Sequence, residues 1–480
     1  MKVTVKNPAS GMPLDFVAKA TGGELILRGT ATPPTVQYVC TDSREADGDT
    51  LFCAIRGERV DGHTYMANTQ GLGCVAFLCE RIPEGLKPPF AAVVVADTVA
   101  ALSELARAYR EAYLSTLTPV AVTGSVGKTT TKECVAAVLS QGGELFKKEG
   151  NFNSVIGLPL SVLEIPETCE SAVLEMGMSG FGEISAMTAA VHPHIAMITN
   201  VGHSHMEMLG SREGIARAKL EISESMVAGD ILVINGDEPL LGDPVTAPLR
   251  ARGVRVLRLS MQDQTADAYL HSIRPVEGGM TFDLRVDGTL WRDLTIPSVG
   301  NHMVWAAGFA AVTGYCLGMT AEQVGRGLAS YVPAAMRQNV YGHQGMTVIE
   351  DCYNASPESM KAAFSVLRLT AKSRMIAVLG DMKELGDASV ALHRQTGEAL
   401  VKLCGTDLRL ITVGALGEEI SRGAEQAGLP KDHISVCLED KPYPQAVASL
   451  KGLCSAGDTL LFKASRSMGL EEIIKAFTQA

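Results

Sequence analysis

Short apolar runs alternate with polar turns over the first hundred residues of this 480-residue chain. The runs VQYVC, TLFCAI, CVAFLC and AAVVVA fall within residues 35–100, and their length and composition predict strands of a small α/β unit. Residues 98–114 place apolar side chains at helical spacing, which predicts a helix leading into the following domain. We therefore expect a first domain over residues 1–97.

The middle of the chain repeats a strand-then-helix pattern that is typical of a mostly parallel sheet covered by helices. Residues 268–297 interrupt it, because the turn signals Gly278-Gly279 and Asp287-Gly288 separate alternating runs typical of an antiparallel ribbon. A central domain over residues 98–332 is therefore expected to combine both kinds of pairing. Its strands are expected at VAVTG after Pro119 and at 172–176, 195–201 and 230–235, with helices at 128–140, 303–317 and 321–331.

Pro333 marks a second boundary, after which the α/β pattern returns. Five apolar runs, each followed by a segment with helical spacing, predict a Rossmann-like third domain over residues 333–480. The predicted fold class is thus α/β with three domains. The five runs are TVIEDC, MIAVLGDM, LITVGA, HISVC and TLLFKAS.

Charge and cysteine usage narrow the classes of function. Asp and Glu total 53 against 42 Lys and Arg, a formal net charge of −11, which argues against a general nucleic-acid binder. The 11 cysteines form no C-x-x-C pair, and their odd number favours reduced thiols in a cytoplasmic protein over a disulfide framework. The uncharged stretch from Met303 to Met319 is short and interrupted by glycine, so no integral membrane segment is expected.

One glycine-rich segment follows a predicted strand and opens a predicted helix. Small residues there allow backbone N–H groups to surround the phosphates of ATP or GTP, with Lys128 reaching the β- and γ-phosphates and the Thr129 hydroxyl holding Mg²⁺. Val122 stands where the first glycine of the usual P-loop pattern would be, and an ordinary glycine-rich turn is the alternative. The expected nucleotide-binding residues here are Thr123, Gly124, Ser125, Val126, Gly127, Lys128, Thr129 and Thr130.

Polar side chains follow two further predicted strands and are expected at the same edge of the sheet. Glu175 ends the run AVLEM and could complete a Mg²⁺ site with Thr129, although a strand-end surface glutamate is an equal alternative. His203 and His205 follow the next strand, where solvated histidines are the alternative to a functional pair. Lys219 lies in the helical segment GIARAKLEISESM, and its spacing with neighbouring charges favours a solvated helix face.

Seven segments together resemble the Mur ligase family, whose members are ATP-dependent amino-acid and peptide ligases of three domains. The resemblance covers nearly the whole chain and is greatest to the branch that adds a dipeptide. The D-N-P-R motif usual in the preceding ligase of the pathway is absent. The segments are TDSREADGDTLFCAIRGERVDGHTYM (41–66), TGSVGKTTTKE, GNFNSVIGLPLSVL (150–163), LEMGMSGFGEI (174–184), ITNVGHSHMEMLGSREGIARAKLEI (198–222), EDCYNASPESMKAA (350–363) and LGDMKELG (379–386).

This resemblance implies a reaction and its participants. We expect ATP-dependent ligation of D-alanyl-D-alanine to UDP-N-acetylmuramoyl-tripeptide through an acyl phosphate, with Mg²⁺, to give the pentapeptide precursor of peptidoglycan. The first domain is expected to bind the uridine nucleotide, the central domain ATP, and the third domain to complete the ligase. A cytoplasmic monomer is expected.

The resemblance also implies roles for individual residues. Lys219 is expected to be carbamylated by CO₂ and to bind a second Mg²⁺ with Glu175 and His205. Arg337 matches an arginine that faces the γ-phosphate, and Asp351 matches a carboxylate near the ribose; Lys128, Lys219, His205 and Arg337 are the expected catalytic set. Substrate contacts are expected at Ser43, Arg44, Asp61, His63, Asn151 and Asn153 for the nucleotide sugar, and at Asn354, Asp381, Lys383, Lys463, Ser465 and Arg466 for the dipeptide or the closed state.

One departure from the family pattern concerns the adenine. The segment PSVGNHMVWAAGFAA (297–311) matches a pattern that helps seat this base, and Asn301 and His302 are expected to contribute, but Ala306 replaces the usual asparagine.

Three alternative functions stay open from the sequence. The chain could be a P-loop regulatory ATPase, another Mur-type amino-acid ligase, or a homologue that binds a nucleotide sugar without catalysis.

Overall fold

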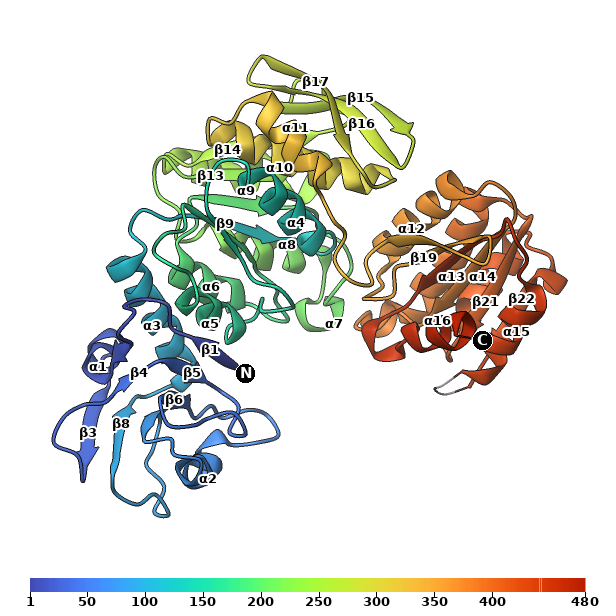
Figure 1. The fold of residues 1–480 in the computed structure, drawn as a ribbon. Helices are drawn as coiled ribbons and strands as arrows, with labels where there is room; N and C mark the ends of the chain where they lie inside the picture. The colour runs from blue at the N-terminus through green and yellow to red at the C-terminus, as the bar shows by residue number, and fades with distance from the viewer. Residues whose placement is uncertain (440, 442, 480) are drawn as a thin grey trace.

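Three α/β domains follow one another along the chain (Figure 1). The structure is a computed structural model that describes residues 1–439, 441 and 443–479. Each domain is built around one main β-sheet within these residues. The predicted fold class, α/β with three domains, is confirmed.

The first domain contains a six-stranded sheet with strand order β1-β5-β6-β7-β8-β3. The four central strands run parallel, whereas β1 and β3 pair antiparallel at the two edges. The apolar runs of the sequence are these parallel strands, and the two edge strands were not predicted because their sequences are short or half-exposed. The elements are β1 (Lys2–Thr4), β2 (Met12–Pro13), α1 (Leu14–Thr21), β3 (Glu24–Arg28), β4 (Thr35–Val36), β5 (Tyr38–Cys40), β6 (Thr50–Cys53), α2 (Met66–Gly71), β7 (Ala76–Cys79) and β8 (Phe90–Val94).

The central domain contains a nine-stranded sheet with strand order β10-β11-β9-β12-β13-β14-β15-β16-β17. Pairing is parallel from β10 to β15 and antiparallel from β15 to β17. Figure 1 shows the antiparallel ribbon at the top of this domain, so the predicted combination of pairings is confirmed. The strands are β9 (Thr118–Thr123), β10 (Leu145–Lys147), β11 (Ser171–Glu175), β12 (Ile195–Ile198), β13 (Ile231–Asn235), β14 (Arg255–Ser260), β15 (Ala268–Val276), β16 (Gly279–Val286) and β17 (Thr289–Ile296).

Helices cover both faces of the central parallel sheet. One group, α4, α10 and α11, packs together on one side, and α3, α5 and α6 pack together on the other. The helices are α3 (Thr98–Tyr113), α4 (Lys128–Leu139), α5 (Gly157–Leu163), α6 (Glu183–Val191), α7 (Met206–Leu209), α8 (Arg212–Leu220), α9 (Asp243–Ala251), α10 (Asn301–Cys316) and α11 (Ala321–Ala329).

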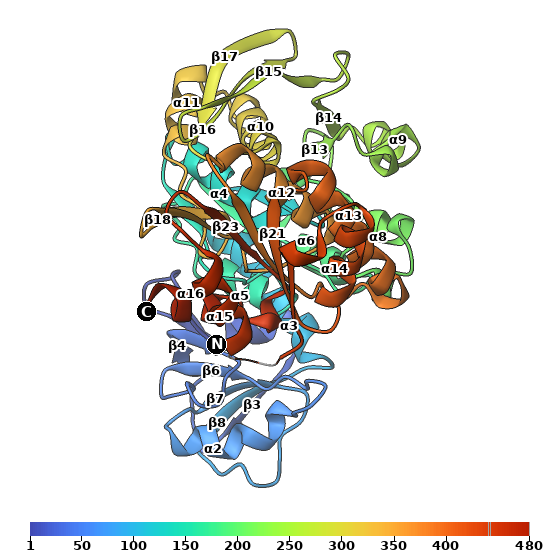
Figure 2. The same ribbon diagram turned by 90° about the vertical axis from the view of Figure 1, so that its right-hand side faces the viewer.

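The third domain contains a six-stranded sheet with strand order β18-β19-β23-β20-β21-β22. All its pairs are parallel except β18 with β19. Figure 2 shows this sheet and its helices in front of the central domain, with the first domain below. The elements are β18 (Asn339–His343), β19 (Met346–Glu350), α12 (Pro357–Thr370), β20 (Met375–Gly380), α13 (Ser389–Cys404), β21 (Leu408–Val413), α14 (Gly417–Gln426), β22 (Ile434–Cys437), α15 (Pro444–Leu453), β23 (Thr459–Lys463) and α16 (Glu471–Thr478).

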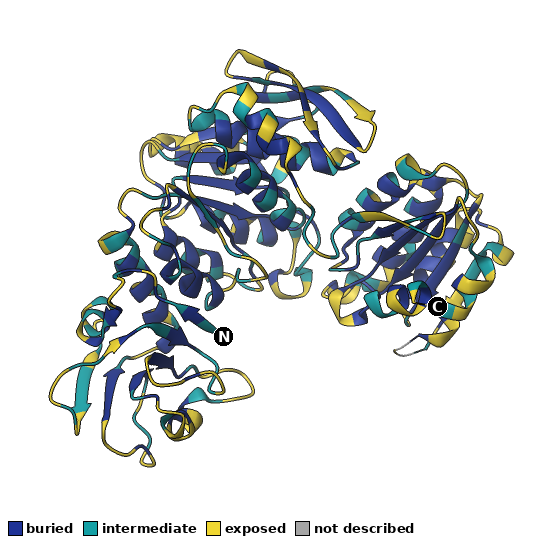
Figure 3. Cartoon of the chain, in the orientation of Figure 1, coloured by how far each residue is buried: buried dark blue, intermediate teal, exposed yellow. Residues whose placement is uncertain are grey.

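The apolar cores show which domains are packed as one unit. One core runs without a break from the first domain to the α5–α6 side of the central sheet, including Val39, Leu105 and Ile184. The fully buried Tyr109 joins the two domains, because its hydroxyl accepts hydrogen bonds from Asn7 N and Asn7 Nδ2 at 2.8 and 2.9 Å. The third domain instead has its own cores on the two faces of its sheet (Figure 3).

Candidate active site

The phosphate loop connects the carboxyl end of β9 to the start of α4. Gly124 and Gly127 have φ values of 152° and 83°, which other residues rarely adopt. A Cβ atom on Gly124 would lie 1.9 Å from Thr199 Oγ1, so the close approach of the loop to its neighbour also demands glycine. The loop thereby directs the first backbone N–H groups and the positive dipole end of α4 to one place, as an anion site requires.

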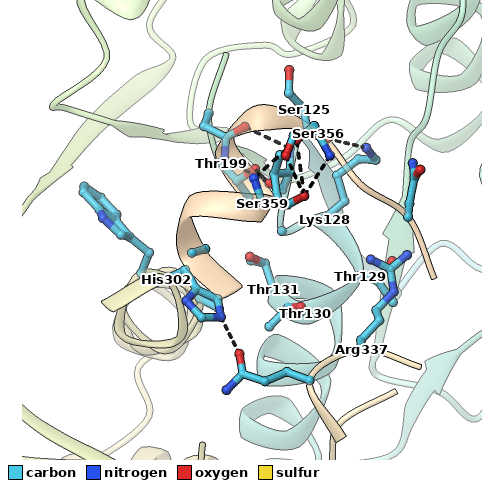
Figure 4. A pocket seen from close by; sticks show the side chains of 18 of the residues that line it. Ser125, Lys128, Thr129, Thr130, Thr131, Thr199, His302, Arg337, Ser356 and Ser359 are labelled. Atoms are coloured by element: carbon cyan, nitrogen blue, oxygen red, sulfur yellow. Dashed lines mark hydrogen bonds between the residues drawn. The ribbon is translucent and has the colours of Figure 1, made fainter. Parts of the chain in front are cut away.

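The segment that follows β12 holds this loop in shape. The Asn200 side chain accepts a hydrogen bond from Val126 N at 2.9 Å and donates one to Val126 O at 3.1 Å. The Thr199 hydroxyl donates to the same carbonyl at 2.7 Å, and Ser125 Oγ accepts from Gly202 N at 2.8 Å. Figure 4 shows Thr199, Ser125 and Lys128 beside one another at this loop. These bonds make the loop a preorganised site for phosphate.

Lys128 folds back over the loop, where its Nζ donates to Gly124 O at 2.8 Å. Burial lowers the pKa of Lys128, and the negative charge of Glu175 opposes that shift. A phosphate group bound in the loop would add further negative charge beside this amine. The geometry therefore suits the role expected of Lys128 toward the β- and γ-phosphates.

Oxygen donors for a divalent cation meet at the carboxyl end of β11. Glu175, which is 8 % exposed, accepts hydrogen bonds from Thr129 Oγ1 at 2.7 Å and from Asn153 Nδ2 at 2.8 Å. Hydroxyl and carboxylate oxygens are the ligands that Mg²⁺ prefers, so this donor set fits a Mg²⁺ ion. The described residues contain no group of three or more His, Cys, Asp or Glu residues that could hold a metal. Mg²⁺ sites in nucleotide-binding proteins commonly use one or two protein ligands together with substrate phosphates and water.

Lys219 lies inside the protein, with 2 % of its surface exposed, so the solvated helix face favoured by its spacing is wrong. The pattern misled because the charged residues at this spacing do not share one solvated face: Arg217 is exposed, whereas Lys219 and Glu221 are buried. Burial lowers its pKa well below the usual value, and the nearby positive charge of Lys128 acts in the same direction. The amine is therefore biased toward its neutral form, the form that can react with CO₂.

Two histidines of the central domain face glutamates of the third domain. His205 Nδ1 lies 3.0 Å from Glu384 Oε2, and His203 Nδ1 contacts Glu358 Oε1. The hydrogen bond from His205 lowers the pKa of Glu384 even though burial opposes it. The two pairs connect the loop after β12 to the third domain, and the imidazole expected to bind metal is engaged there.

A cavity of about 280 Å³ lies between the phosphate loop, α10 and the third domain. Figure 4 shows Thr130 and Thr131 of α4 between His302 on one side and Arg337 on the other. Trp305, Ala306 and Phe309 of α10 form an apolar part of its wall. An apolar wall opposite a phosphate loop suits a nucleotide, whose base is flat and whose phosphates are charged.

The third domain closes this cavity with residues around β19. Arg337 stacks on the Tyr353 ring, 4.1 Å from its centroid, and both line the cavity. The buried Lys463 donates to Asp351 Oδ2 at 2.6 Å and to Asn354 O at 3.1 Å. Four residues predicted at different points of the sequence, Arg337, Asp351, Asn354 and Lys463, are thus brought together at one wall.

His302 also lies at this wall, whereas Asn301 is exposed and is not among the lining residues. His302 Nε2 is 2.6 Å from Gln338 Oε1, and Gln338 Nε2 donates to Ser298 Oγ and Val299 O. Burial lowers the pKa of His302, which favours the neutral ring. Gln338 therefore orients His302 from the third domain.

The candidate residues of the first domain lie away from this cavity. Asp61 accepts hydrogen bonds from Arg81 Nη2 at 2.5 Å and pairs with His63 Nδ1 at 2.7 Å, and His63 Nε2 accepts from Glu80 N at 2.8 Å. This buried histidine thus joins the 61–65 turn to the end of β7. Exposed Arg44 pairs with Asp42, next to the half-buried Ser43.

Four candidate residues of the third domain bond mainly to their own domain. Asp381 Oδ1 accepts from Leu416 N and Gly417 N at 3.0 and 2.9 Å, which caps α14, and its Oδ2 accepts from Lys383 Nζ at 2.8 Å. Ser465 Oγ accepts from Lys383 N at 2.9 Å. Arg466 pairs with Glu471 at 2.5 Å. None of these four lines the 280 Å³ cavity, within the part of the chain that the structure describes.

Several residues at the cavity carry no sequence signal that would have singled them out. Gln338 follows Arg337 in an irregular segment, and Tyr353 is one aromatic residue among others. Trp305 and Phe309 read as core positions of a buried helix. Their roles depend on which elements meet in space, which periodicity does not report. The cavity-lining residues not predicted include Thr131, Thr199, Ser204, Asn235, Met303, Trp305, Phe309, Tyr331, Gln338, Tyr353, Ala355, Ser359, Ala362 and Ala363.

The fold and the site define a P-loop nucleotide-binding protein of three α/β domains. Residues 122–313 match the Mur ligase middle domain, residues 336–466 match the glutamate ligase domain of Mur ligases, and residues 35–110 match the Mur ligase family catalytic domain. The chain belongs to the Mur ligase family, as its sequence motifs predict.

Relatives and solved structures agree with this assignment. The chain is 39 % identical over 458 residues to UDP-N-acetylmuramoyl-tripeptide–D-alanyl-D-alanine ligase of Bacillus subtilis, covering 94 % of this chain and 96 % of the relative. The structure is similar to MurF of Acinetobacter baumannii, with a TM-score of 0.87 at 28 % identity over 98 % and 99 % of the two chains. It is also similar to MurF of Thermotoga maritima in complex with ADP, with a TM-score of 0.79 at 28 % identity over 92 % and 97 %.

No helix formed by the described residues combines the length and apolar character needed to cross a membrane. The 11 cysteines are free thiols, and nine of them are buried. Burial raises the pKa of Cys74 to about 11 and that of Cys404 to about 12, which disfavours the thiolate form of these two core residues.

Proposed function

We propose that this protein ligates D-alanyl-D-alanine to UDP-N-acetylmuramoyl-tripeptide with the hydrolysis of ATP to ADP and phosphate. The observation that carries the proposal is the phosphate loop facing a cavity that Arg337 of the third domain helps to close. The names of full-length relatives supply the two substrates. The absence of a D-N-P-R motif distinguishes this function from that of the preceding ligase.

ATP would occupy the 280 Å³ cavity. Its phosphates would bind the segment from Thr123 to Thr130, and its base would contact α10 near His302 and Ala306. Asp351, held by Lys463, would face the ribose. Asn301 is a weaker candidate for the base, because it is exposed outside the lining.

Mg²⁺ would be held by Thr129 and Glu175, where bound cations neutralise phosphate charge and orient the γ-phosphate. A second ion would be held by Glu175, His205 and a carbamylated Lys219. The buried, neutral-biased amine of Lys219 is the chemical form that carbamylation needs. The pair with Glu384 occupies Nδ1 of His205, so Nε2 would bind the metal while the carboxylate orients the ring.

In the first step, the terminal carboxylate of the tripeptide attacks the γ-phosphorus of ATP, giving an acyl phosphate and ADP. Two anions must approach each other, and Lys128 and Arg337 supply positive charge to offset their repulsion. In the second step, the amine of the dipeptide attacks the acyl carbon and phosphate leaves with the bonding electron pair, while the amine gives up a proton. The acyl phosphate must be kept from water, which suits closure of the third domain.

The remaining candidate residues would divide between the two other substrates. Ser43, Arg44, Asp61, His63, Asn151 and Asn153 would serve the nucleotide sugar, with His63 acting by holding its turn in place. Asn354, Asp381, Lys383, Lys463, Ser465 and Arg466 would serve the dipeptide or the closed state. We further propose domain borders near residues 97 and 332, a monomer, and a cytoplasmic location.

The test is phosphate release from MgATP with the nucleotide-linked tripeptide and D-alanyl-D-alanine supplied separately and together. We expect release only with both, together with a product of pentapeptide mass. Release from ATP alone would identify a regulatory ATPase instead. Binding of the nucleotide sugar without release under any combination would identify a homologue that has lost catalysis.

A further inference from the structure

Lys132 is a buried lysine to which the mechanism above gives no role. It lies on α4, one helical turn after Thr129, and is 3 % exposed. Fully buried lysines are rare in proteins and are found with partners that satisfy the amine. Its partners therefore indicate what it does.

The Lys132 amine has two partners in different elements. Nζ donates to the backbone carbonyl of Lys148 at 3.1 Å and lies 3.1 Å from Glu133 Oε1. Glu133 in turn pairs through Oε2 with Lys147 at 2.5 Å. The Lys132 amine thus joins α4 to the chain that follows β10. The carboxylate of Glu133, also on α4, makes a second link through Lys147 at the end of β10.

The chain beyond Lys148 carries Asn151 and Asn153, the residues proposed to meet the nucleotide sugar. Asn153 Nδ2 donates to Asn151 Oδ1 at 2.9 Å and to Glu175 Oε1 at 2.8 Å. Glu175 Oε2 accepts from Thr129 Oγ1 at 2.7 Å. A closed ring of contacts therefore starts at Thr129 of α4, passes through Glu175 and the asparagines, and returns to α4 at Lys132.

The side chain of Lys148 is anchored on the far side of this segment. Its Nζ contacts Glu164 and lies 4.6 Å from the centroid of the Phe152 ring. Only the backbone carbonyl of Lys148 is directed to Lys132 among the contacts described. The 148–153 segment is thus fixed at its start by Lys132 and at its end by Glu175.

We propose that Lys132 is a positioning residue, which sets the distance between the phosphate-loop helix and the 148–153 segment so that ATP and the nucleotide sugar are held in register. The role rests on the proposed function for the identity of the sugar substrate. The structural link between Lys132 and the 148–153 segment is independent of the proposed function and can be tested without any ligand.

A cavity of about 390 Å³ beside Lys132 offers a different role. Lys132, Asn151 and Arg337 line it, so the amine could instead touch a bound substrate directly. The two roles differ in the ligand-free protein. A positioning residue holds the 148–153 segment at all times, whereas a direct contact acts only once the ligand is bound.

The experiment is hydrogen–deuterium exchange of the full-length, ligand-free protein for the wild type, Lys132→Met and Lys147→Met. Lys132→Met keeps the aliphatic length and leaves Glu133 paired with Lys147. Lys147→Met is the matched control, because Lys147 also pairs with Glu133 but is 42 % exposed. We expect faster exchange in peptides over 145–160 for Lys132→Met alone, with peptides of α4 and β9 unchanged.

Unchanged exchange over 145–160 would overturn the proposal. So would faster exchange that extends equally through α4, since that would make Lys132 a stabiliser of its own helix.

Binding gives a second readout: ADP affinity should change less than about twofold in Lys132→Met, while nucleotide-sugar affinity falls about tenfold and Lys132→Arg recovers part of it. An equal loss of ADP affinity would contradict the positioning role. If the wild type binds no nucleotide sugar, the proposed function fails, and the exchange experiment still decides the role of Lys132.

Discussion

The central and third domains both contribute polar residues to the proposed reaction, but they hold them differently. In the central domain, Asn200, Glu175 and Asn153 bond to residues of other strands and loops around the phosphate site. In the third domain, Asp381 bonds to the start of α14 and to Lys383, within its own domain. The first set is already arranged around the cavity, whereas the residues around Asp381 lie outside it and bond within their own domain.

This difference indicates how the site is completed. The central and first domains share a continuous core, whereas the third domain has cores of its own and meets the loop after β12 through the pairs of His203 and His205. A few polar pairs are easier to rearrange than a shared apolar core. We expect ATP to bind the structure as it stands, and the dipeptide to bind after the third domain moves.

The largest effect on ligation is expected from a substitution in the phosphate loop, which belongs to the prearranged central-domain part of the site. Lys128→Ala should lower ligation by about a thousandfold or more, because it removes the amine that faces the phosphates. The protein should stay folded, since the lysine bonds to loop carbonyls and not to the core. Product mass and thermal unfolding of the same sample measure the two quantities. Ligation at the wild-type rate in Lys128→Ala would contradict the assignment of this loop as the phosphate-binding site for ATP.

Lys219→Ala should reduce ligation by about a hundredfold, since the proposed carbamate bridges to metal. Small carboxylates such as formate or acetate should restore part of the activity, because they can occupy the space of the carbamate. Arg217→Ala is the matched control: it lies on the exposed side of α8, over the Phe181 ring, and should have little effect. Wild-type activity in Lys219→Ala would mean that Lys219 is a buried lysine with a structural role only.

Two substitutions in the third domain are expected to have different effects, one on stability and the other on activity. Asp381→Ala removes the cap of α14 and should lower the unfolding free energy by about 1–2 kcal/mol. Lys383→Ala removes an exposed amine and should leave stability nearly unchanged, while raising the KM for the dipeptide about tenfold. Urea unfolding and steady-state kinetics distinguish the two. If both variants lose only stability, these charges hold the domain together and do not meet substrate.

The sequence predicts the central half of the site better than the third-domain half. The phosphate loop and Glu175 follow apolar strands whose carboxyl ends meet at one sheet edge, so topology alone brings them together. Edge strands β1 and β3, and the antiparallel β18, have no strong alternation and were not predicted. Strand pairing at an edge depends on neighbours that are distant in sequence.

Lys219 and Gln338 show the limit of pattern reasoning within the site. The spacing of charges on α8 predicts a solvated lysine, but the lysine packs into the interior beside Lys128. Gln338 bonds to His302 and Val299 across a domain boundary. Both results depend on packing between elements, and only the family resemblance pointed to Lys219.

The smallest effect is expected at the apolar wall that α10 contributes to the nucleotide cavity. Ala306 is 2 % exposed and lines the nucleotide cavity where the family pattern usually has asparagine. Ala306→Asn adds an amide that can bond to adenine, and should tighten ATP binding by about threefold while discriminating more strongly against GTP. Ala306→Ser is the control, since it adds a hydroxyl with shorter reach. Calorimetric affinities for ATP and GTP would measure both changes. Weaker ATP binding in Ala306→Asn would mean that the wall is packed against the base already, and that the alanine belongs to a differently shaped adenine pocket.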